Sequence, residues 1–191
     1  MNNSKVVIIG YACDEGVRRN NGRVGAKDGP DAIRKCMGKL PLRDIDKGNI
    51  TCEDGNLEKT QQELGERVEK ELKQDNFPLV IGGGHDIAYG HFLGINKAIQ
   101  GTVGIINLDA HFDLRPFQNG GNSGTPFNQI SALLKAQNNT FHYLPIGIRE
   151  NSNSAELYQT AKTLNVQYIP MEVCTLDNIP QIKKTIQGTG E

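Results

Sequence analysis

Two short stretches of the sequence carry side chains that could hold a metal ion. The first is Ile81–Asp86, with the sequence IGGGHD, and the second is Asn107–Pro116, with the sequence NLDAHFDLRP. In the second stretch Asp109, His111 and Asp113 alternate with apolar residues, so an extended chain would project all three to one side. Mixed carboxylate and imidazole ligands suit Mn²⁺, Fe²⁺ or Zn²⁺ better than Mg²⁺ or Ca²⁺. Two such ions can share and activate one water, which serves hydrolysis at an electrophilic carbon.

Each stretch follows a predicted buried strand, and strands alternate with helices along the chain. This alternation predicts an α/β protein with a parallel sheet, whose ligand site lies at the carboxyl ends of the strands. We therefore expect His85 to converge with the three side chains that follow the next strand. The predicted strands are Lys5–Ile9, Phe77–Ile81, Thr102–Leu108, Phe141–Ile148 and Val166–Ile169, with two weak extended segments in residues 41–52. Helices are predicted to begin at Gly29, Asn56, Asp86, Pro126, Ser154 and Asp177, and residues 10–29 to form a loop.

Other interpretations of the glycine-rich turn are weaker. It lacks the Lys-Ser/Thr pair of a P-loop and the third glycine of a dinucleotide fingerprint. His85 alone would more often be structural, and His91 and His142 are expected to be structural as well. The pairing of the two motifs at successive strand ends favours a metal site.

Composition indicates which kinds of partner the protein binds and in which cell compartment it lies. Lys and Arg total 21 and Asp and Glu total 22, so the net charge of −1 argues against nucleic-acid and membrane-surface binding. The four cysteines form no CxxC pair, and scattered thiols are typical of cytosolic proteins. The apolar run near the N-terminus is too short for a signal peptide or a membrane span. We expect a cytoplasmic protein with no nucleic-acid partner and no membrane association.

The two motifs together make the family recognisable. GGGHD, followed after one more helix and strand by DAHFD, resembles the arginase/ureohydrolase family. Further segments resemble its formimidoylglutamase branch: CDEGVRRNNGRVGAKDGPDAIR, GGGHDIAYGHFLGI, DAHFDLRP, SGTPFNQI and GIRENSNSAEL. The resemblance implies a three-layer α/β/α fold with a mainly parallel sheet. It also implies one arginase-like domain over residues 1–191, as the N-terminal part only, with the C-terminal strands and helices missing.

The resemblance also implies an activity, with roles for particular residues. The activity is Mn²⁺-dependent hydrolysis of N-formimidoyl-L-glutamate to L-glutamate and formamide, in histidine breakdown. By motif position, His85 and Asp113 would bind the first Mn²⁺, His111 the second, and Asp109 both. Arg115 would pair with a substrate carboxylate, because a guanidinium binds a carboxylate bidentately. The substrate-binding candidates are Arg115, Asn122, Ser123 and Thr125, with Arg18, Arg19 and Arg23 as weaker ones. The catalytic acid stays unassigned.

One departure from the family pattern bears on activity. The family's third motif, similar to SxDxDxxDP, has no counterpart after Asp113, and Asp177 stands alone. We therefore expect a weak second Mn²⁺ site and reduced turnover by this chain.

Two alternatives stay open: a non-catalytic truncated paralogue or isoform with a partial metal site, and another ureohydrolase acting on a guanidino substrate. Arg115 and the segment SGTPF argue against the latter, because they suit an anionic substrate. The expected partner is a small molecule that carries carboxylates, and a homo-oligomer is left open.

Overall fold

The computed structural model describes residues 4–38 and 45–189. The chain forms two compact units: the first is Met1–Gln100 with Phe117–Pro126, and the second is Gly101–Pro116 with Phe127–Glu191. Each unit contains one three-stranded parallel sheet, in the order β2-β1-β3 in the first and β4-β5-β6 in the second. The parallel sheets and alternating helices confirm the predicted α/β class.

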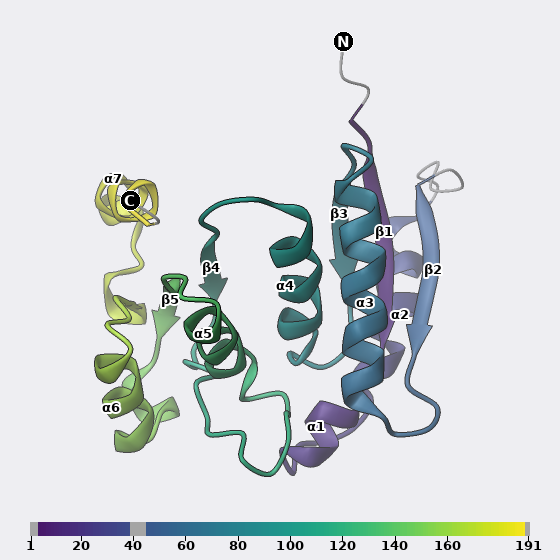
Figure 1. Cartoon of the computed structure of the whole chain (residues 1–191). Coiled ribbons are helices and arrows are strands. Elements are labelled where there is room, and N and C mark those ends of the chain that lie inside the picture. The colour runs from purple at the N-terminus through teal and green to yellow at the C-terminus, as the bar shows by residue number, and fades with distance from the viewer. Residues whose placement is uncertain (1–3, 39–44, 190–191) are drawn as a thin grey trace. The chain divides into compact units, whose positions relative to one another are not determined.

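The first unit is built around strand β1 (Figure 1). Its elements are β1 (Val6–Ala12), α1 (Glu15–Arg19), a 3₁₀ turn (Ala26–Asp28), α2 (Gly29–Met37), β2 (Asp46–Thr51), α3 (Leu57–Leu72), β3 (Phe77–Ile81) and α4 (Ile87–Ala98). Within this unit α2 and α3 lie on opposite faces of the sheet (Figure 1). Consecutive β1 residues are therefore buried, as expected for a strand covered on both faces.

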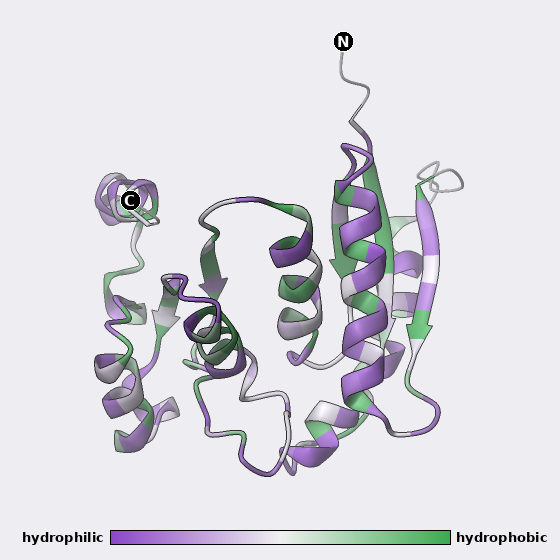
Figure 2. Cartoon of the chain, in the orientation of Figure 1, coloured by the Kyte–Doolittle hydropathy of each residue, from purple (hydrophilic) through white to green (hydrophobic). Residues whose placement is uncertain are grey.

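Helix α3 supplies the apolar face that packs on β1. Leu57, Leu64 and Val68 recur at helical spacing and are fully buried against the odd-numbered residues of β1. Figure 2 shows this helix as largely hydrophilic on its outer face and β1 behind it as hydrophobic. The predicted cap is confirmed, because the Asn56 side chain accepts a hydrogen bond from the Lys59 N–H.

Helices α3 and α4 approach each other closely at glycines. A Cβ atom at Gly94 would lie 2.4 Å from the main-chain oxygen of Gly65, and one at Gly90 would lie 2.9 Å from that of Gln61. Side chains larger than hydrogen are therefore excluded here. This contact fixes α4, which begins directly after the IGGGHD turn.

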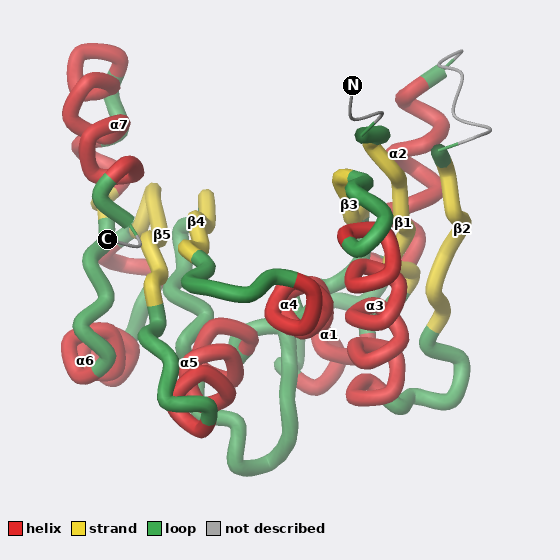
Figure 3. Tube along the Cα trace, turned by 45° about the horizontal axis from the view of Figure 1, so that its top comes forward, coloured by secondary structure: helices red, strands yellow, loops and turns green. Residues whose placement is uncertain are grey.

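The second unit is built around strand β5. Its elements are β4 (Gly104–Leu108), α5 (Pro126–Ala136), β5 (His142–Ile148), a 3₁₀ turn (Glu150–Ser152), α6 (Ala155–Thr163), β6 (Ile169–Pro170), two further 3₁₀ turns (Met171–Val173, Leu176–Asn178) and α7 (Ile179–Gln187). The strands β4 and β5 stand side by side in Figure 3. The predicted apolar face of α5, formed by Phe127, Ile130 and Leu134, is buried.

The structure corrects three details of the sequence-based expectation. Residues 10–29 are not only loop, because they contain α1. One strand, β2, replaces the two weak extended segments, whose residues 41–44 lie outside the described part of the chain. Strand β6 is shorter than predicted. Among the described residues β3 pairs only with β1 and β4 only with β5, so each of these two strands ends its sheet.

Candidate metal centre

In the second unit, two carboxylates and an imidazole follow β4 within five residues, at Asp109, His111 and Asp113. The chain does not stay extended through Asp113: β4 ends at Leu108, and Asp113 has a φ of +47°. Oδ1 of Asp109 accepts a hydrogen bond from the His111 main-chain N–H at 2.9 Å and lies 3.2 Å from His111 Nδ1. This turn, rather than strand alternation, places the Asp109 carboxylate beside the His111 ring. The donor chemistry suits a divalent transition ion.

The same segment is fixed through Phe112 and Asn153. The Phe112 ring is fully buried, with the rings of Tyr158 and Tyr168 edge-on to it at centroid distances of 5.1 Å. The Asn153 side chain accepts a hydrogen bond from the Phe112 N–H at 3.0 Å and donates one to the Ala110 oxygen at 2.8 Å. Asn153 therefore holds the main chain on both sides of His111.

A buried tyrosine supports the segment from β5. Oη of Tyr143 donates a hydrogen bond to the Phe112 oxygen at 3.0 Å and accepts one from Asn107 Nδ2 at 3.1 Å. Burial raises the pKa of Tyr143 above its ordinary value, and the charges of Asp113 and Asp109 raise it further. The hydroxyl therefore keeps its proton and remains a donor.

In the first unit, His85 follows β3 in a turn that requires glycine. Gly82 and Gly83 have φ values of +78° and +79°, and a Cβ at Gly83 would lie 2.3 Å from the Tyr11 oxygen. The Gly84 N–H donates to the Cys13 oxygen at 2.8 Å, which ties the turn to the end of β1. His85 is half-buried in this turn.

The sequence patterns do not indicate a role for the next residue, Asp86. Its carboxylate is fully buried, and its Oδ2 accepts a hydrogen bond from Tyr11 Oη at 2.8 Å. Burial raises the pKa of Asp86 to about 6, although the hydrogen bond from Tyr11 acts in the opposite direction. A carboxylate directly after the candidate histidine is the one sequence signal that could have indicated it.

The candidate substrate residues lie in both units. Arg115 belongs to the second unit and is exposed, and Asn128 Nδ2 donates to its main-chain oxygen at 3.1 Å. Residues 117–126 belong to the first unit, where the Ser123 N–H donates to the Gly16 oxygen at 3.0 Å and Asn20 Nδ2 donates to Ser123 Oγ at 3.1 Å.

The other polar side chains of this loop have partners within it. Thr125 is buried, and its Oγ1 accepts from the Asn122 N–H and donates to the Asn122 oxygen, both at 2.9 Å. Oδ1 of Asn122 accepts from the Gly124 N–H at 2.8 Å. These contacts give Asn122, Ser123 and Thr125 a role in shaping the loop.

The weaker arginine candidates differ from one another in the structure. Arg18 and Arg19 both pair with Glu15, and Arg19 also pairs with Glu58 on α3. Nη1 of Arg19 donates to the Gly121 oxygen at 3.3 Å, so this side chain joins α1, α3 and the loop of residues 117–126. Its hydrogen bond to Glu58 is the main reason why the pKa of Arg19 lies above its ordinary value. Arg23 is exposed.

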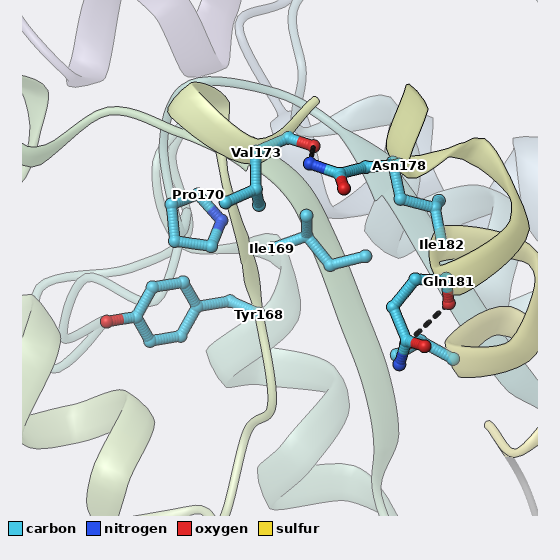
Figure 4. A pocket seen from close by; sticks show the side chains of 8 residues that line it. Tyr168, Ile169, Pro170, Val173, Asn178, Gln181 and Ile182 are labelled. Carbon is cyan, nitrogen blue, oxygen red and sulfur yellow. Dashed lines mark hydrogen bonds between the residues drawn. The ribbon is translucent and has the colours of Figure 1, made fainter. Parts of the chain in front are cut away.

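Two pockets in the second unit were not indicated by the sequence. One, of about 260 Å³, lies between β6 and α7, where Asn178 Nδ2 donates to the Val173 oxygen (Figure 4). The other, of about 490 Å³, is lined by Ile148, Glu150, Tyr158, Tyr168, Pro170 and Glu172. Neither is lined by a candidate metal-binding or substrate-binding residue.

Comparisons with known proteins identify the family to which the chain is similar. The family model "Arginase family" matches residues 4–190. A formimidoylglutamase from Aeromonas salmonicida is 45% identical over 183 residues, which are 93% of this chain and 58% of that protein. One from Geobacillus thermodenitrificans is 42% identical over 188 residues, 94% of this chain and 57% of that protein. The chain thus spans less than two thirds of these curated relatives.

Solved structures show the same likeness. A structure of Trypanosoma cruzi formiminoglutamase with Mn²⁺ matches with a TM-score of 0.85 and 30% identity, over 99% of this chain and 68% of that one. A formimidoylglutamase structure from Bacillus subtilis matches with a TM-score of 0.81 and 26% identity, over 98% of this chain and 61% of that one. Among the described residues, no helix is both long enough and apolar enough to cross a membrane. The match to the family model over nearly the whole sequence shows that the chain belongs to the arginase family.

Proposed function

We propose that this protein is a Mn²⁺-dependent hydrolase that cleaves N-formimidoyl-L-glutamate to L-glutamate and formamide in histidine breakdown. The observation that carries the proposal is the held segment after β4, which presents Asp109 and His111 side by side. The names of the curated relatives support the substrate. We also propose that the two units are parts of one arginase-like domain.

The proposed ligand set draws on both motifs. His85, Asp109 and Asp113 would hold the first Mn²⁺, and Asp109 with His111 would contribute to a weaker second site. When bound, Mn²⁺ would act as a Lewis acid and would lower the pKa of a water molecule. The hydrogen bond from the His111 main-chain N–H holds the Asp109 carboxylate beside the His111 ring, so these two proposed ligands already lie close together.

The substrate would be oriented by its carboxylates. Arg115 is exposed, so its guanidinium is available to form two parallel hydrogen bonds with one carboxylate. Asn122, Ser123 and Thr125 would contribute to substrate binding by shaping the neighbouring loop. In the overall reaction the water oxygen bonds to the formimidoyl carbon, the bond from that carbon to the glutamate nitrogen breaks, and this nitrogen gains a proton.

Location and partners follow from composition as part of this proposal. The cysteines at positions 13, 36, 52 and 174 are free, as expected in a reducing compartment, and we place the protein in the cytoplasm. The balanced charge supports a small-molecule substrate rather than nucleic acid. A homo-oligomer is compatible with the proposal.

The test combines metal binding with turnover. Isothermal titration with Mn²⁺ should show binding that Asp109→Asn and His85→Ala weaken strongly. Glutamate release from N-formimidoyl-L-glutamate should require Mn²⁺, while L-arginine and agmatine should not react. Turnover of arginine or agmatine instead would favour another ureohydrolase. Mn²⁺ binding with no turnover of any of the three would favour a non-catalytic paralogue, and no Mn²⁺ binding would contradict the metal centre.

A further inference from the structure

A fully buried hydroxyl–carboxylate pair lies directly beside His85 in the first unit. Tyr11, on β1, and Asp86, before α4, are both 0% exposed, and Tyr11 Oη donates to Asp86 Oδ2 at 2.8 Å. The main-chain oxygen of Asp86 accepts a second hydrogen bond from Gln61 Nε2, on α3, at 2.9 Å. Asp86 is thus held by its side chain from β1 and by its main chain from α3.

Glycines on two sides make the space for this carboxylate. A Cβ atom at Gly16 would lie 2.1 Å from Asp86 Oδ1, and one at Gly84 would lie 2.5 Å from the same oxygen. Any side chain at Gly16 or Gly84 would therefore displace the carboxylate. The surrounding chain is shaped around an aspartate at position 86.

Stability alone does not account for this arrangement. Burying a carboxylate is costly unless its oxygens are well paired, and apolar side chains of similar size are often at least as stable. Within the described part of the chain, Asp86 Oδ1 has no hydrogen-bond partner. A half-satisfied buried carboxylate therefore points to a positioning role.

The residue that Asp86 would position is the one before it. The main-chain oxygen of His85 accepts from the Ala88 N–H at 3.1 Å, so His85 and Asp86 share the turn that begins α4. A metal-ligating imidazole must be held to within about 0.5 Å of its productive position. We propose that Tyr11 and Asp86 form a positioning pair that sets the orientation of His85 for metal binding. The proposal rests on the metal role proposed above for His85.

The decisive variant is Tyr11→Phe, which keeps the buried ring and removes only the hydroxyl. Loss of a supporting hydrogen bond to a metal site typically weakens metal binding about 10- to 100-fold. We expect a loss of this size in the Mn²⁺ affinity of Tyr11→Phe, measured by isothermal titration at a temperature where circular dichroism shows the variant folded. Asp86→Asn, which keeps the side-chain volume, should show a similar loss, and the double variant should lose no more than either single one.

Two further variants separate the possible outcomes. Tyr89→Phe is the matched control, because its hydroxyl is in the same unit and forms no hydrogen bond with the described residues. It should leave the Mn²⁺ affinity unchanged. His85→Ala gives the loss expected when the ligand itself is removed. Weaker binding in His85→Ala with wild-type binding in Tyr11→Phe would overturn the positioning role alone. Wild-type binding in His85→Ala would overturn both this inference and the proposed metal role of His85.

Discussion

The hydroxyl of Tyr143 donates a hydrogen bond to the main-chain oxygen of Phe112 at 3.0 Å, between the candidate ligands His111 and Asp113. Through this hydrogen bond, strand β5 helps to set the conformation of the segment that follows its neighbour, strand β4. The position of the two candidate ligands thus depends on a residue that need not touch metal.

Tyr143→Phe should therefore weaken the second unit. The substitution leaves the Phe112 oxygen and the Asn107 side chain short of one partner each, which costs about 1–3 kcal/mol. Urea unfolding should show this loss, and Mn²⁺ affinity should fall with it. Tyr158→Phe is the control, because the Tyr158 ring packs on Phe112 while its hydroxyl makes no hydrogen bond to the described residues. Equal losses in both variants would contradict the assigned role of the Tyr143 hydroxyl.

Arg115→Ala should raise KM for N-formimidoyl-L-glutamate in the Mn²⁺-loaded protein. A charge-assisted bidentate contact is worth roughly 1.5–3 kcal/mol, so the expected increase is about 10- to 150-fold. Arg115→Lys should restore little, because an ammonium lacks the planar fork. Steady-state glutamate release measures both variants. Arg23→Ala, at another exposed arginine, should behave as wild type. An unchanged KM in Arg115→Ala would show that this side chain only faces solvent.

The Arg34–Asp46 pair makes the stability of the first unit depend on pH. Arg34 Nε and Nη2 donate to the two Asp46 oxygens at 2.6 and 2.7 Å, and these hydrogen bonds hold the pKa of Asp46 below its ordinary value of 3.8. A carboxylate with a lowered pKa in the folded state stabilises it fully above the unfolded pKa. This contribution is lost as pH falls through the folded pKa.

Asp46→Asn should accordingly lower the free energy of unfolding at pH 7 by about 1–3 kcal/mol. The difference from wild type should shrink as pH falls below 3.8, because the Asp46 carboxylate then takes up a proton, first in the unfolded chain and at lower pH in the folded one. Urea unfolding at pH 7, 5 and 3 measures this change. Asp31→Asn is the matched control, because Asp31 is exposed and lies 3.5 Å from Arg34. A difference that stays constant with pH would contradict the role of the Asp46 charge.

Gly94→Ala should destabilise the first unit although alanine is the better helix former. The propensity gain is about 1 kcal/mol. A Cβ at this position would lie 2.4 Å from the Gly65 oxygen and 2.6 Å from Val68 Cβ, so α3 and α4 must separate, which costs about 1–3 kcal/mol. Thermal unfolding should show a lower midpoint. Lys97→Ala, exposed on the same helix, should leave the midpoint unchanged, and a stabilised Gly94→Ala would show that the helices move apart at little cost.

Helices and strands whose buried face is set by residues close together in the sequence were predictable. The boundaries of Phe77–Ile81 are confirmed, as are the Asn56 cap and the buried face of α5, because each depends on neighbouring residues along the chain. Helix α1 was missed because it has no apolar stripe. Pairs of Glu15 with Arg18 and Arg19, one turn apart, support it instead.

The candidate centre was predictable as a set of residue types but not as geometry. The sequence indicated Asp109, His111 and Asp113, while their conformation depends on a turn that alternation does not reveal. The contact between Tyr11 and Asp86 joins residues 75 positions apart, so no local pattern encodes it. Each such contact is set by how strands pair and helices pack.

The outer position of strands β3 and β4 in their sheets affects how the purified protein behaves at high concentration. Each ends its sheet among the described residues, and each carries exposed apolar side chains, with Phe77 63% and Leu108 80% exposed. Outer strands of this kind offer unpaired main-chain donors and acceptors to another molecule. Concentrated solutions should therefore self-associate through added strands, with light scattering that rises steeply with protein concentration and a growing β signal in the infrared amide band.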